Sequence, residues 1–211
     1  FHAALPGAYY APLLDVAQRE GRIGRAPWQP DLPVHTAWDL GIGDATAIWF
    51  VQQAGPELHW IDYYEADGYG LDHYVKQIRE RPYVYGEHLL PHDAAARELG
   101  TGRSRVETLQ RLGLRTRIVP MHAVADGINA VRTLLPRSWF DERLCGGGLE
   151  ALRSYRREWD DRRRIFGDHP LHDWASHAAD AARTAAMGLR GPRDASKLPQ
   201  TAETDYDVFA R

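Results

Sequence analysis

Acidic residues that follow hydrophobic strands are the first candidates for chemistry in this sequence. The stretch from His35 to Val51 predicts a strand that ends at Asp39, a glycine turn, and a second strand that returns beside the first. A carboxylate on a rigid strand, next to glycines that leave room for a ligand, suits the binding of a metal ion. The alternative is a hairpin in which Asp39 caps its own turn.

Two later stretches supply further acids. Asp93 follows another predicted strand, although it also fits a solvated loop acid. An alanine-rich helix is predicted from Asp173 onward, and on it Asp173, His177 and Asp180 fall within about 60° of one another. The alternative is that Asp173 caps the helix while His177 and Asp180 lie on the surface.

Taken together, three of these acids predict a metal site. Asp39 and Asp93 lie at strand ends, and Asp180 lies on a late helix that can pack over the sheet. Hard oxygen ligands of this kind suit two Mg²⁺ or Mn²⁺ ions, and two such ions can hydrolyse a phosphodiester. Carboxylates crowd together unfavourably unless cations neutralise them, so the cluster predicts metal dependence.

The elements that must position these residues follow in a regular order. Hydrophobic periodicity predicts three strands, then alternating helices and strands, with a capping box from Ser104 to Glu107 at the start of one helix. This order predicts an α/β fold with a mixed central sheet, in which strands 1–3 are antiparallel, later strands add in parallel, and helices cover both faces.

The division of the chain follows from its composition. Closely spaced prolines at Pro27, Pro30 and Pro33 indicate a stiff lead-in, so residues 1–33 are expected to be a linker or the end of a preceding domain. Residues 34–188 form the expected main domain. A polar tail is expected over 189–211.

Composition narrows the class of protein. The chain has 211 residues, a net charge of −3 and a single cysteine, Cys145, which excludes an internal disulfide and fits a reducing compartment. It shows no apolar run long enough to span a bilayer and no signal peptide, so we expect a soluble cytoplasmic protein. Among 26 basic residues, Lys76 and Lys197 are the only lysines. Arginine suits phosphate contacts, but a GC-rich genome gives the same bias.

The combination of motifs in order resembles one family, the nuclease domain of the large terminase subunit of tailed bacteriophages, which is RNase H-like. The resemblance covers roughly residues 34–188. The residues that carry it are Asp39-Leu-Gly-Ile-Gly-Asp44-Ala-Thr46, Pro91-His92-Asp93-Ala94, the run from Arg97 to Arg105, and the run from His172 to Arg183.

The resemblance implies a metal-dependent endonuclease that cuts concatemeric double-stranded viral DNA during packaging. Carried over to this chain, the metal-binding acids are Asp39, Asp93 and Asp180, with Asp173 as the alternative helix acid. His177 matches a histidine that some members place beside the metals, where it would assist proton transfer or contact phosphate.

Several further residues are expected near such a site. Asp44 and Glu65 are candidate supporting acids, although a surface or core-edge position is favoured for Glu65. Arg103 and Arg105 follow the Asp93 strand and are expected to reach a phosphate. Arg156 belongs to an arginine cluster that either steers DNA or forms an ordinary salt-bridged surface helix.

The resemblance also implies partners: double-stranded DNA, the small terminase subunit, the portal protein and an ATPase motor, all in the cytoplasm of the host bacterium. The Gly-x-x-x-x-Gly-Lys-Ser/Thr loop of such a motor does not occur in this sequence. If the chain is a fragment, its first thirty residues would be the end of that motor or the linker from it.

Other interpretations remain open at this point. They are another RNase H-like nuclease or resolvase, a nucleotide-binding protein of the actin and sugar-kinase type, and a non-catalytic DNA- or portal-docking module. A zinc hydrolase using His169, His172 and His177 is the least favoured.

Overall fold

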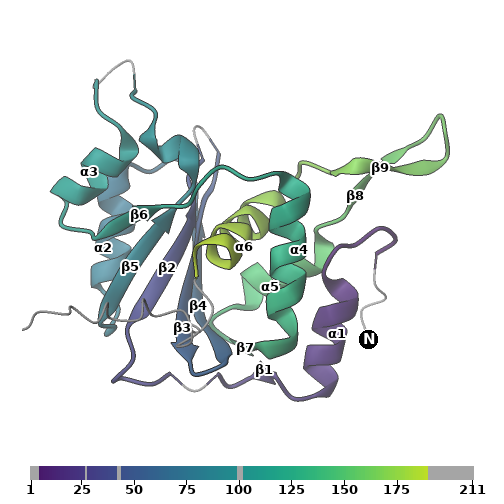
Figure 1. The fold of residues 1–211 in the computed structure, drawn as a ribbon, viewed down its shortest axis with the longest axis horizontal. Coiled ribbons are helices and arrows are strands. Elements are labelled where there is room, and N and C mark those ends of the chain that lie inside the picture. The colour runs from purple at the N-terminus through teal and green to yellow at the C-terminus, as the bar shows by residue number, and fades with distance from the viewer. Residues whose placement is uncertain (1–4, 27, 42–43, 99–101, 190–211) are drawn as a thin grey trace, which may run out of the picture.

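A seven-stranded sheet forms the centre of the molecule (Figure 1). The computed structural model describes residues 5–26, 28–41, 44–98 and 102–189. In chain order the elements are α1 (Ala11–Arg19), β1 (Ile23–Gly24), β2 (Val34–Asp39), β3 (Thr46–Ala54), β4 (Glu57–Ala66), α2 (Leu71–Arg79), β5 (Tyr85–Leu90), the 3-10 helix η1 (His92–Ala95), α3 (Arg105–Arg111), β6 (Thr116–Ile118), α4 (Val124–Leu134), the 3-10 helix η2 (Leu135–Arg137), β7 (Ser138–Asp141), α5 (Gly146–Ser154), β8 (Arg157–Asp160), β9 (Ile165–Pro170) and α6 (Ser176–Gly188).

The strand order is β1-β7-β4-β3-β2-β5-β6. Strands β2, β3 and β4 pair antiparallel, as the short turns between them predict. Parallel strands extend the sheet on both sides: β5 and β6 beside β2, and β7 and β1 beside β4. The expected mixed sheet is therefore confirmed.

Alternation along the strands creates two cores, because successive side chains point to opposite faces of a sheet. On β2, Val34 and Trp38 pack with residues of α2 and α3 on one face. Ala37 on the same strand, and Trp49 on β3, pack with α6 and α4 on the other. Figure 1 shows α2 and α3 on one side of the sheet and α1, α4, α5 and α6 on the other. Helices thus cover both faces, as expected.

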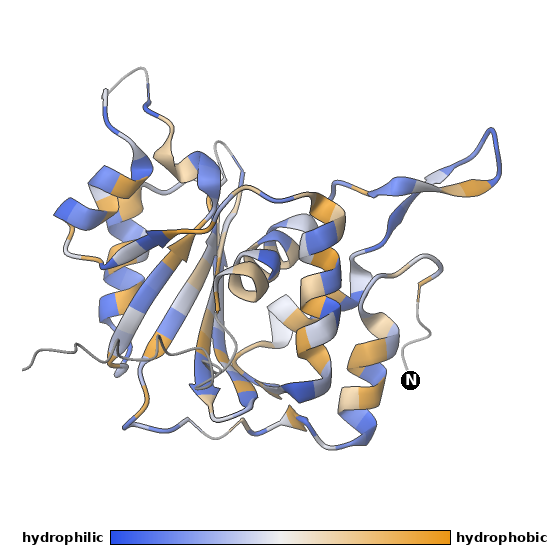
Figure 2. Ribbon diagram, viewed as in Figure 1, coloured by the Kyte–Doolittle hydropathy of each residue, from blue (hydrophilic) through white to orange (hydrophobic). Residues whose placement is uncertain are grey.

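Three elements differ from the sequence-based expectations. The last helix begins at Ser176, so Asp173 lies in the turn that precedes it. The short strands β1 and β7 have no counterpart among the predicted elements. Residues 157–170, for which an ordinary surface helix was favoured, form the β8–β9 hairpin, whose far end is mostly hydrophilic (Figure 2).

The segment before β2 packs on the sheet. Tyr10, Leu14 and Ile23 are buried in the same core as α6, and β1 pairs in parallel with β7. Where the domain begins in a longer chain remains a prediction, as does the linker assignment of residues 1–33. Apart from Leu189, the tail expected over 189–211 lies outside the described residues. Within the described helices, none combines the length and apolarity that a membrane crossing requires.

Candidate functional site

Asp39 is the last residue of β2 and faces α6. It lies directly opposite Ala47 of β3, which is buried in the core on the α6 side of the sheet. The Oδ2 atom of Asp39 is 3.1 Å from Nδ1 of His177 in the first turn of α6. The hydrogen bond to Asp39, with further contributions from the charges of Glu65 and Asp44, raises the pKa of His177 despite partial burial. The strand and the helix therefore share one polar contact at this point.

Small residues let α6 approach the sheet closely enough for that contact. Ala178, Ala181 and Ala182 of α6 are fully buried. The indole N–H of Trp49 on β3 donates to the carbonyl oxygen of Ala178 at 2.8 Å and fixes the helix against the strands. The close helix–sheet packing predicted from the alanine-rich sequence is confirmed.

Asp180 lies one turn further along α6, and its side chain is 32% exposed. Burial raises the pKa of Asp180 to about 6, and the negative charge of Asp39 adds to the shift, while Arg183 opposes it. Arg183 forms an ion pair with Asp180 at 2.5 Å. Asp39 and Asp180 thus face a common, poorly hydrated and negatively charged space.

Glu65 lies closer to this space than the surface or core-edge position favoured from the sequence. Cross-strand register places Asp39 opposite Ala47 and Ala47 opposite Glu65, so both acids lie on the same face of the sheet. Tyr63 donates its hydroxyl proton to Oε2 of Glu65. Glu65 is therefore a supporting acid at the rim of the site.

Asp93 is held apart from these residues. It lies in η1, just beyond β5, which is the parallel neighbour of β2. Its Oδ2 atom is 3.2 Å from Nη2 of Arg105, and its side chain is 51% exposed. Within the described ranges, no three His, Cys, Asp or Glu side chains lie close enough together to hold a metal ion as placed. The structure thus brings Asp39, His177 and Asp180 together but leaves Asp93 bound to arginine.

Asp173, the alternative helix acid, has other partners. Its Oδ1 atom accepts a hydrogen bond from the amide of Ala175 at 3.0 Å, and its Oδ2 atom is 3.4 Å from Nη1 of Arg156. Asp173 therefore orders the turn before α6, which is the capping role considered for it. The same ion pair occupies Arg156, one of the expected DNA contacts.

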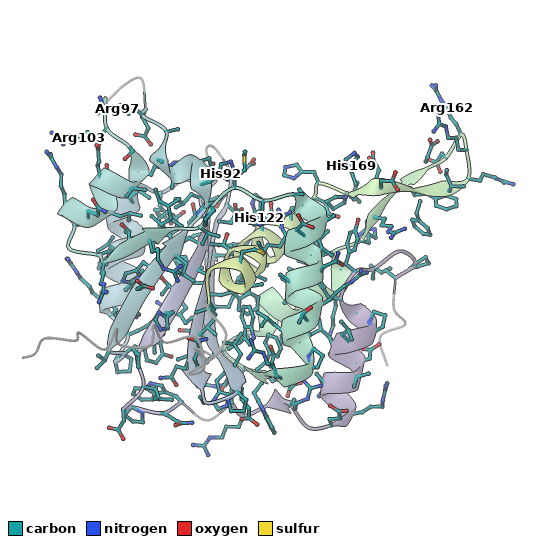
Figure 3. The ribbon with its side chains drawn as sticks, in the orientation of Figure 1. His92, Arg97, Arg103, His122, Arg162 and His169 are labelled. Carbon is teal, nitrogen blue, oxygen red and sulfur yellow. The ribbon has the colours of Figure 1, made fainter. Side chains whose placement is uncertain are left out.

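The other two expected DNA contacts differ in exposure. Arg105 is 6% exposed and points into the protein, which does not fit the phosphate contact expected for it. Arg103 is exposed beside the loop that precedes α3 (Figure 3). Figure 3 also places Arg162 at the far end of the β8–β9 hairpin. DNA contacts by Arg103 and Arg156 remain predictions.

The histidines considered for zinc do not form a preformed site. The ring centroids of His172 and His177 are 6.3 Å apart, and His169 lies in β9. The oxygen donors of Asp39 and Asp180 fit Mg²⁺ or Mn²⁺, which prefer hard carboxylate ligands. Asp93 supplies a third, half-exposed carboxylate from the end of the neighbouring strand. The donor set fits such a cation if Asp93 joins the other two acids.

Sequence reasoning missed Arg183 and the inward direction of Arg105. Asp180 and Arg183 are three residues apart on a helix, and this spacing places their side chains together. That signal was present in the sequence. No local pattern indicates the partners of Arg105, because they come from two separate strand ends.

Comparison with known proteins gives no match to a family model and none to a curated protein. Solved structures do match. The full-length large terminase of one thermophilic bacteriophage superposes with a TM-score of 0.65 at 16% identity, covering 84% of this chain and 45% of that one. This chain therefore spans less than half the length of that terminase.

Two isolated nuclease domains match over most of their length. The P22 large terminase nuclease domain has a TM-score of 0.58 at 18% identity, covering 80% of this chain and 88% of that domain. The large terminase nuclease of the thermophilic phage G20c, solved with bound magnesium, has a TM-score of 0.54 at 13% identity, covering 85% and 98%. This chain therefore has the RNase H-like fold of the large terminase nuclease domains.

Proposed function

We propose that the chain is a metal-dependent DNA endonuclease that cuts concatemeric double-stranded viral DNA during genome packaging. The observation that carries this proposal is the position of Asp39, at the end of β2, facing His177 and Asp180 of α6. The G20c nuclease of the same fold was solved with magnesium. We propose Asp39, Asp93 and Asp180 as the metal ligands, with room for two ions.

Each side chain has a distinct part in the proposed reaction. Two divalent ions held by the three acids would activate a water molecule and stabilise the leaving oxygen of the phosphodiester. His177 orients Asp39 through Nδ1, and its raised pKa lets it carry a proton near the reacting phosphate. Glu65, held by Tyr63, adds negative charge that favours cation binding.

Plasmid cleavage tests the proposal directly. Supercoiled plasmid would be incubated with the parent chain and with Asp39→Asn, Asp93→Asn and Asp180→Asn, each with Mn²⁺ and with EDTA. Removal of a ligand should exceed the about 10- to 100-fold loss typical of removing an outer partner of a metal site. The matched control is Asp72→Asn, an exposed acid in the first turn of α2 on the opposite face.

The outcomes separate the competing functions. We expect Mn²⁺-dependent nicking by the parent and the control, and its loss in the three site variants. Equal cleavage by all chains would refute the three-acid assignment, and no cleavage by the parent would favour a docking module. Asp173→Asn should retain activity, because Asp173 orders a turn and pairs with Arg156.

Packaging partners belong to the same proposal. We expect a longer parent protein to join this domain to an ATPase motor and to meet the small terminase subunit and the portal. Co-purification of the longer protein with those subunits would test this expectation separately from cleavage.

A further inference from the structure

A buried arginine connects the two strand ends that carry Asp39 and Asp93. Arg105 is the first residue of α3, and its side chain is 7% exposed. Its Nη1 atom donates to the carbonyl oxygen of Leu40 at 2.8 Å. Its Nη2 atom donates to Oδ2 of Asp93 at 3.2 Å and approaches the carbonyl oxygen of Asp93 at 3.4 Å.

The helix itself does not need this cation. Ser104 and Glu107 close a complete capping box, which already satisfies the start of α3. A positive charge in the first turn opposes the helix dipole, and a buried guanidinium is costly unless it is paired. The interactions that compensate Arg105 therefore come from outside α3, at the ends of β2 and β5.

Those two ends lie side by side. Strands β2 and β5 are parallel neighbours, with Ala37 opposite Leu89. Leu40 directly follows Asp39, and Asp93 lies in the 3-10 turn just beyond β5. The planar guanidinium reaches both ends at once, which the single ammonium of a lysine cannot do with the same geometry.

We propose that Arg105 is a positioning residue that ties the end of β2 to the turn after β5 and orients Asp93 toward the metal site beside Asp39. The inference rests on the proposed nuclease function. Arg105 binds one carboxylate oxygen of Asp93, and a metal ion would take the other. Hydrogen-bonded partners of ligating carboxylates typically contribute about 10- to 100-fold to metal affinity.

Hydrogen exchange of the metal-free protein tests the tie without any metal. Arg105→Met removes the charge but keeps much of the packing of the aliphatic stem, and Arg105→Lys keeps the charge alone. We expect Arg105→Met to speed exchange in peptides covering Trp38–Gly41 and Leu90–Glu98. Arg111→Met, an exposed arginine at the other end of α3, is the matched control and should match the parent.

Calorimetric titration with Mn²⁺ tests the orientation of Asp93. We expect Arg105→Met to raise the Kd for Mn²⁺ by about 10- to 100-fold, Arg105→Lys to raise it less, and Arg111→Met to leave it unchanged. In the Asp93→Asn background, Arg105→Met should have almost no further effect on the Kd, because both substitutions remove the same ligand. General destabilisation would not produce that non-additivity.

The two measurements separate the possible failures. Parent-like exchange in Arg105→Met, or a parent-like Kd for Mn²⁺, would overturn the positioning role. If Arg105→Met does not fold, Arg105→Lys carries the same two measurements. If the parent binds no Mn²⁺ and cuts no DNA, the proposed nuclease function fails, and the exchange rates still confirm or refute the tie between the strand ends.

Discussion

Lowering the pH from 7 to 5 should destabilise the fold through one buried histidine, His88 of β5. Its Nδ1 atom is 2.7 Å from Oγ1 of Thr36 on β2. The same Oγ1 atom accepts the indole N–H of Trp38 at 2.7 Å. We infer that the Thr36 hydroxyl donates its proton to His88, so the imidazole accepts at Nδ1 and is neutral in the folded protein.

The size of the effect follows from the pKa. Burial, with a smaller contribution from His35, lowers the pKa of His88 to about 4, against 6.5 for an ordinary histidine. Between these values the unfolded chain binds a proton that the folded chain does not. This part of the stability is therefore complete above pH 6.5 and is lost as the pH falls toward 4. The loss between pH 7 and 5 is about 2 kcal/mol, at about 1.4 kcal/mol per pH unit.

Urea unfolding at pH 7, 6 and 5 would measure this loss, with His88→Asn as the comparison. Asparagine offers an acceptor near the position of Nδ1 but has no proton to bind in this range. Asp180 has a raised pKa and contributes with the opposite sign, but it is present in both chains. We expect the free energy of unfolding of the parent to fall by about 2 kcal/mol more than that of His88→Asn. Equal losses in the two chains would refute the assignment.

Other predictions concern the packing and charge around α6. Gly148→Ala should lower the free energy of unfolding by about 1–3 kcal/mol, because its Cβ would lie 2.3 Å from the Trp49 ring; Gly147→Ala, whose nearest neighbour is 3.9 Å away, should not, as thermal unfolding would show. Trp49→Phe should cost about 1–3 kcal/mol in urea unfolding, because the buried carbonyl of Ala178 loses its donor, and should also slow plasmid nicking. EDTA should abolish nicking while the circular dichroism spectrum stays unchanged.

Most of the sheet could be predicted because its central strands have clear alternation. The strands over β2, β3 and β4 each combine a buried face with short turns, and their antiparallel order follows from those turns. Strands β1 and β7 could not be predicted in the same way. They have two and four residues, and they are strands only because they pair with each other and with β4.

The β8–β9 hairpin was missed for a different reason. Its residues are mostly charged, and exposed charge also suits a surface helix with ion pairs. The turn at Arg164 adopts a positive φ of 55°, which a non-glycine residue rarely signals in advance. Local propensity alone therefore did not distinguish the two structures.

The site shows the same division between local and long-range information. That Asp39 would lie at a strand end and Asp180 on a late helix followed from periodicity, and the structure places both there. The inclusion of Asp173 on that helix was wrong, since the helix begins three residues later. The partners that bind the acids, above all Arg105, depend on chain segments that meet only after folding.

The three proposed ligands differ in how firmly the fold holds them. Asp39 is fixed by its pairing with β3, and Asp180 by the buried alanine face of α6. Asp93 lies beyond its strand and is half exposed, and its carboxylate is oriented by the ion pair with Arg105. An acid in a regular element keeps its direction when one neighbour is removed, whereas an acid in a turn depends on that neighbour. Asp93 is therefore the ligand whose position relies most on a single contact, and for the same reason its direction was the least predictable from sequence.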